Sequence, residues 1–115
     1  MAQFLVEHVH TDETCPSKTV EGVKMMGELV LGQDHARRTG VRFLNDYVVR
    51  GKHRLLLLIE ADSPQNAENY AKPFRMVGKT EVHPLTKCET IIQEVTAQKG
   101  AQQITATGCG SVTAV

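Results

Sequence analysis

A run of five large aliphatic residues, Leu55 to Ile59, constrains the fold of this chain most. Together with the residues around it, the run predicts a β-strand over residues 54–61. Successive side chains of a strand point to opposite faces, so an uninterrupted apolar run predicts a strand that is covered on both faces. The run is also far shorter than the ~20 residues that a membrane-spanning helix needs. The sequence therefore predicts a central buried strand and no membrane segment.

The segments on either side of this strand predict an alternation of strands and helices. In chain order, the expected elements are a strand over residues 3–10, a helix from Val20 whose last short turn ends before Gly40, strands over residues 41–49 and 54–61, a helix from Pro64 that breaks at Pro73 and ends before Gly78, and a last strand within residues 79–94. Thr19 and Ser63 are the expected N-caps of the two helices. The order β-α-β-β-α-β predicts an α+β ferredoxin-like fold with an antiparallel four-stranded sheet.

Length and composition predict one domain over residues 1–96. Residues 97–115 are rich in Ala, Gln, Thr, Gly and Ser, so they are expected to form either a polar C-terminal tail or an added strand. The 13 basic and 13 acidic residues cancel, which favours neither nucleic acid nor a membrane surface as a partner. The N-terminus shows no pattern of a secretory signal, so we expect a cytoplasmic protein.

Alternation along residues 54–61 predicts a homodimer. Leu55, Leu57, Ile59 and Ala61 share one face and are expected to pack under the helices, whereas Leu56, Leu58 and Glu60 share the other. Exposing a leucine to water costs about 1.5–3 kcal/mol. The residues expected to extend this second apolar face are Leu5, Val9, Leu44 and Val48. Two copies that pair these faces about a twofold axis would bury them.

The richest chemistry lies at residues 7–16, EHVHTDETCP. His8 and His10 are two positions apart on the first strand and so share a face, and Cys15 follows in the loop. In the ferredoxin-like order the first and last strands are neighbours, which predicts that His83 and Cys88 approach the same edge. Imidazole and thiolate ligands suit Zn, Cu, Ni or Fe. A metal site on the helix side of the sheet, a pocket for a small molecule, and purely structural histidines all remain open.

Other polar residues offer further hypotheses. Glu7 and Glu60 could act as general bases on the dimer face, or form ion pairs with the arginines at 42, 50 and 54. The hydroxyl group of Tyr47 could bind a ligand in a pocket. His35 and His53, at a helix end and in a hairpin, are expected to be solvated.

Three cysteines in a cytoplasmic protein indicate free thiols or metal ligands. A disulfide between Cys15 and Cys88 is the alternative in an oxidising compartment. His10 could also lower the pKa of the Cys15 thiol and make it reactive.

Several motifs together resemble the small dimeric α/β-barrel (ferredoxin-like) proteins, many of which are domains of unknown function. The motifs are FLVEHVHT, VRFLNDYVV, RLLLLIEA, ADSPQNAENYA and TEVHPLTKCETI, and the resemblance covers about residues 1–95. It implies kinship with muconolactone-isomerase-like enzymes, antibiotic-biosynthesis-type monooxygenases and small nickel-binding proteins.

The leading hypothesis is a homodimer that binds a transition metal or a small ligand between its sheet and its helices. The alternatives are a cofactor-independent isomerase or monooxygenase-like enzyme with His8 or His10 as acid or base, and an interaction module whose function is dimerisation itself.

Overall fold

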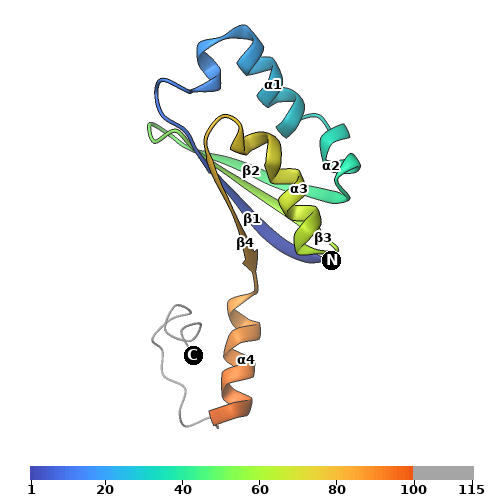
Figure 1. Ribbon diagram of the computed structural model, residues 1–115. Coiled ribbons are helices and arrows are strands. Elements are labelled where there is room, and N and C mark those ends of the chain that lie inside the picture. The colour runs from blue at the N-terminus through green and yellow to red at the C-terminus, as the bar shows by residue number, and fades with distance from the viewer. Residues whose placement is uncertain (100–115) are drawn as a thin grey trace. The chain divides into compact units, whose positions relative to one another are not determined.

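The computed structural model describes residues 1–99 and divides the chain into two compact units (Figure 1). The first unit spans Met1–Leu85, and the second begins at Thr86. Among the described residues, no helix is both long enough and apolar enough to cross a membrane.

The first unit contains a four-stranded antiparallel sheet in the order β2-β3-β1-β4. Its strands are β1 (Ala2–Val9), β2 (Val41–Val49), β3 (Arg54–Ala61) and β4 (Lys79–Leu85). The apolar run lies in β3, an inner strand between β2 and β1. From Leu55 on, its side chains alternate between buried and half-buried, so within the first unit only one of its faces is fully covered. The element order and the sheet confirm the α+β ferredoxin-like fold.

Three helices pack on one face of this sheet: α1 (Val20–Val30), α2 (Asp34–Arg38) and α3 (Pro64–Arg75), with a short 3-10 turn η1 (Pro16–Lys18) before them (Figure 1). Thr19 and Ser63 cap α1 and α3, because their hydroxyl groups accept hydrogen bonds from the backbone N–H groups of Gly22 and Asn66. Residues 34–38 form a separate helix, not a last turn of α1. Pro73 lies inside α3 without ending it.

The core lies between α3 and the sheet. The fully buried Tyr70 and Phe74 of α3 belong to the same apolar cluster as Val6, Leu57 and Ile59 of β1 and β3. The opposite face of β3 carries the half-buried Leu56 and Leu58. We call this second face, on which β1 contributes Leu5 and Glu7, the open face of the sheet.

A β-bulge in β2 changes which residues reach the open face. Phe43 pairs with Ile59 and Asn45 pairs with Leu58, so Leu44 has no partner in the ladder. The extra residue reverses the alternation beyond it. Tyr47, opposite Leu56, therefore lies on the open face, whereas Val48, opposite Leu55, lies on the helix face. The prediction that Val48 extends the open apolar face is wrong for this reason, and for the unpaired Leu44 it stays a prediction.

The second unit begins after a strand shorter than its predicted range. β4 ends at Leu85, and residues from Cys88 form helix α4 (Cys88–Lys99). Good helix formers such as Glu89, Gln93 and Ala97 favour this conformation. The sequence predicts a domain over residues 1–96, whereas the first compact unit ends at Leu85 and α4 runs across position 96. Of the predicted tail or added strand, residues 97–99 complete α4 and the remainder lies outside the described residues.

Candidate metal centre

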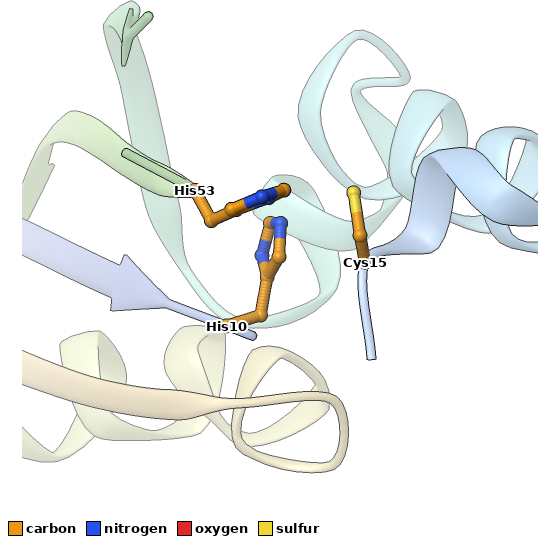
Figure 2. Close-up of side chains that lie close together, drawn as sticks. All are labelled: His10, Cys15 and His53. Atoms are coloured by element: carbon orange, nitrogen blue, oxygen red, sulfur yellow. The ribbon is translucent and has the colours of Figure 1, made fainter. Parts of the chain in front are cut away.

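Three potential metal ligands converge at one end of the sheet: His10, Cys15 and His53 (Figure 2). One donor atom from each lies within 4.8 Å of the other two, and all three residues are partly buried. They come from separate segments, namely the residue after β1, the loop before η1 and the turn between β2 and β3. Two imidazoles and a thiolate on three segments form a donor set that suits a transition metal.

Strand pairing brings the two histidines together. β1 and β3 are antiparallel neighbours, and their ladder ends at the pair Val9 and Arg54. Just beyond it, the backbone N–H group of His10 donates to the carbonyl oxygen of His53 over 3.1 Å. His53 has a φ of 51° in the tight turn that contains Gly51. The centroids of the two imidazole rings are consequently 5.1 Å apart.

A small turn over residues 11–14 brings Cys15 close to the two histidines. The Thr11 N–H group donates to Thr14 Oγ1 over 3.0 Å, and the Thr14 N–H group donates to Thr11 Oγ1 over 3.2 Å. Cys15 follows directly, and the buried Pro16 begins η1. Cys15 is a free thiol, with Sγ 2.9 Å from Ser17 Oγ, so the alternative of a Cys15–Cys88 disulfide is wrong.

His8 lies behind His10 and is completely buried. Its Nε2 atom is 3.1 Å from Nδ1 of His10, and its Nδ1 atom is 3.0 Å from Oγ1 of Thr80. This contact occupies Nδ1 of His10 and leaves Nε2 as the ring nitrogen for a metal. Metal-bound histidines usually have such a partner on the second nitrogen.

Electrostatics favour neutral imidazoles here. Burial lowers the pKa of His8, and the neighbouring His10 lowers it further. Burial likewise lowers the pKa of His10, with a second contribution from His53. A neutral imidazole is the form that binds a metal ion. In addition, a carboxylate oxygen of Asp12 lies 3.7 Å from Nε2 of His53 and can orient that ring.

The structure brings together only part of the predicted metal set. His10 and Cys15 meet, and His8 supports His10 from behind. His83 pairs with Leu5 in the ladder, so it lies on the open face, and Thr80 takes the place opposite His8. Cys88 is the first residue of α4 in the second unit.

His53 is a potential ligand that the sequence alone did not indicate. It was expected to be solvated, but its side chain is only 36% exposed and belongs to the triad. The available signal was the strand order, which makes the start of β3 a neighbour of the end of β1. His35 is not simply solvated either, because Nε2 lies 2.8 Å from the carbonyl oxygen of Tyr70 and the two rings stack.

A second group of potential ligands lies on the open face: Glu7, Glu81 and His83. Its carboxylates already have cationic partners, because Glu7 is 3.3 Å from Arg54 and Glu81 is 3.4 Å from Lys79. These ion pairs make the group a weaker candidate than the triad.

The remaining candidates also lie on the open face. Glu60 is 3.6 Å from Arg42, so both Glu60 and Glu7 form the ion pairs that were the alternative to general-base roles. They sit opposite Gln3 and Leu56 in the ladders, not beside each other. Tyr47 is 55% exposed and its hydroxyl oxygen accepts a hydrogen bond from Asn45 over 2.7 Å.

Comparison with known proteins gives a family and a distant structural likeness. The model of the family described as "Domain of unknown function (DUF3303)" matches residues 9–99, a range that contains the whole triad. A dimeric ferredoxin-like protein from an uncultured marine organism is 16% identical, with a TM-score of 0.37, and the match covers 72% of this chain and 87% of that one. No curated protein matches the chain significantly.

Proposed function

The chain belongs to the DUF3303 family, a domain of unknown function, and from this premise we propose that it is a small metal-binding protein that holds a transition-metal ion at His10, Cys15 and His53. The observation that carries the proposal is the convergence of three donor atoms within 4.8 Å from three separate segments.

The geometry suits a tetrahedral ion best. Bonds of about 2.3 Å to sulfur and 2.0–2.1 Å to nitrogen place the ligand atoms of a tetrahedral zinc roughly 3.3–3.8 Å apart. Donors within 4.8 Å can reach this spacing by small side-chain rotations. Two histidines and one cysteine also suit copper, whereas Ni and Fe commonly take further ligands. Three protein ligands leave the fourth position open, as in catalytic sites. We therefore favour Zn or Cu.

A cobalt titration tests the proposal. Co²⁺ added to untagged, metal-free protein is expected to give visible bands of a tetrahedral ion and an ultraviolet thiolate-to-cobalt band, which added Zn²⁺ removes. Cys15→Ser should abolish the thiolate band, and His53→Ala should weaken binding at least tenfold.

His83→Ala is the matched control, because this histidine belongs to the group on the open face. It should bind Co²⁺ like the wild type. Equal binding by the wild type, Cys15→Ser and His53→Ala would refute the site, and loss of binding in His83→Ala alone would assign the metal to the open face.

An enzyme of the isomerase or monooxygenase type is the second candidate, and the buried contacts from His10 through His8 to Thr80 favour it. A neutral His10 at the edge of a cavity could accept a proton from a substrate, and His8 would hold its ring in place. In that case metal-free protein would bind substrate, and His10→Ala would lose turnover without any change caused by chelators.

We also propose that the protein is a homodimer joined through the open face. Leu5, Leu56 and Leu58 are half-buried there, although no helix of the first unit covers them, and Tyr47 is exposed beside them. Sedimentation at micromolar concentration should give a dimer. Leu58→Asp should give a monomer, whereas Leu31→Asp, at an exposed residue after α1, should not. A monomeric wild type would refute this interface.

A further inference from the structure

We propose that the cavity beside the triad holds the aliphatic chain of a small molecule whose head group lies at His10, Cys15 and His53. The cavity has a volume of about 440 Å³, and all three triad residues line it. Such a volume lies in the usual range for small-molecule sites. Binding of the head group rests on the proposed function, whereas binding of the aliphatic chain rests on the cavity itself.

The cavity has a polar end and an apolar end. Away from the triad its walls are aliphatic, formed by Val23 and Met26 of α1 and by Val48 and Leu55 of β2 and β3. Val23 and Val48 are 56% and 65% exposed, although both face the same hollow. Apolar side chains that line a cavity and still meet water gain free energy when a ligand covers them.

The lining also indicates what kind of ligand fits. It contains no phenylalanine, tyrosine or carboxylate side chain, so its only aromatic rings are the two imidazoles of the triad, and it offers no carboxylate to pair with a cation. The guanidinium group of Arg54, which borders the cavity, is already paired with Glu7. An aliphatic chain with a neutral or anionic head group that donates to the metal is the chemistry that matches both ends.

The triad argues for a small molecule over a protein segment as the occupant. An apolar patch that covers another part of a protein needs no convergent donors at its edge, whereas a ligand with a polar head does. A metal ion held by these three residues would lie beside the cavity that they all line, and it would supply a Lewis acid that binds the polar head group of a ligand there.

The reactivity of Cys15 can report whether the cavity binds an aliphatic chain, and this test needs no metal. The probes are alkyl methanethiosulfonates with chains from methyl to hexyl. The Cys15 thiolate attacks the sulfenyl sulfur of the probe, an S–S bond forms, and methanesulfinate leaves with the electron pair of the broken bond. The rate at the peptide that carries Cys15 is followed by mass spectrometry, relative to the rate of each probe with free glutathione.

Each buried methylene should raise the relative rate about fourfold, which is the factor that corresponds to ~0.8 kcal/mol per methylene. Val23→Gln and Val48→Gln should flatten this dependence, because both side chains line the cavity. Val20→Gln is the matched control, since Val20 lies on the same helix, is 82% exposed and does not line the cavity. The three valines are exposed enough for the substitutions to leave the fold intact.

The outcomes separate the two proposals. A flat dependence on chain length in the wild type overturns this inference even if Co²⁺ binds, and so does an unchanged dependence in both Val23→Gln and Val48→Gln. A steep dependence that the two lining variants remove and Val20→Gln retains supports it, even if the cobalt titration fails.

Discussion

The buried contact between Thr80 and His8 gives the sharpest test of how the site is built. The substitution is Thr80→Val, which removes the hydroxyl group and keeps the shape of the side chain. His8 is fully buried and Thr80 is only 8% exposed, so water cannot replace the lost partner. The variant therefore leaves Nδ1 of His8, now 3.0 Å from Oγ1 of Thr80, without its hydrogen bond.

An unsatisfied buried polar group costs about 1–3 kcal/mol. That is a large part of the roughly 5–15 kcal/mol by which small proteins are stable. It corresponds to a decrease in melting temperature of at least about 4 °C for a unit of this size. If both partners were replaced by apolar groups, most of the cost would disappear. Thr80→Val should thus cost less in a His8→Leu background than in the wild type.

Urea denaturation at pH 7.5 measures these free energies, with Thr90→Val, at an exposed threonine of α4, as the control. The control should stay within about 0.5 kcal/mol of the wild type. A free energy of unfolding for Thr80→Val within the same limit would refute the reasoning. If Thr80→Val lowers the free energy of unfolding equally in the wild type and in His8→Leu, the Thr80 hydroxyl group does not stabilise the protein through its contact with His8.

Two further predictions concern stability. The pKa of His8 is lowered in the folded protein, so below about pH 6.5 the unfolded chain binds more protons than the folded one. The free energy of unfolding should therefore fall as the pH drops below 6.5, by up to about 1.4 kcal/mol per pH unit. A free energy of unfolding that does not change between pH 7.5 and 5 would contradict this prediction. Gly40→Ala should destabilise the protein by at least about 1 kcal/mol, because φ is +70° and the new Cβ would lie 2.8 Å from Asn66 Nδ2. Gly27→Ala in α1 should stabilise it by up to about 1 kcal/mol, because the new Cβ would meet no atom within 4 Å. Thermal melting measures both effects.

Local sequence signals were enough to predict most of the fold. Thr19 and Ser63-Pro64 mark the starts of α1 and α3, and the strands at residues 41–49 and 54–61 have the predicted bounds. These signals depend on caps, turns and side-chain alternation over a few residues, which any reader of the chain can see. The helix from Cys88 was harder, because its apolar residues do not form a single stripe and Pro84 made the segment resemble an irregular strand.

The candidate site was only half visible in the sequence. The spacing of His8, His10 and Cys15 drew attention to the end of β1, and the potential ligands that converge there include His10 and Cys15. The assignment of His83 failed because β4 pairs with β1 in a register that places Thr80, not His83, opposite His8. A shift by an odd number of residues moves a side chain to the other face of a sheet.

The sequence by itself determined the element order, the buried face of β3 and the clustering of imidazole and thiol groups after β1, because each depends on residues close together along the chain. Only the tertiary structure decided that His53 completes the group, that His8 supports it from behind, and that the bulge at Leu44 places Tyr47 on the open face. Those outcomes depend on strand register, which packing and backbone hydrogen bonds fix between segments far apart in sequence.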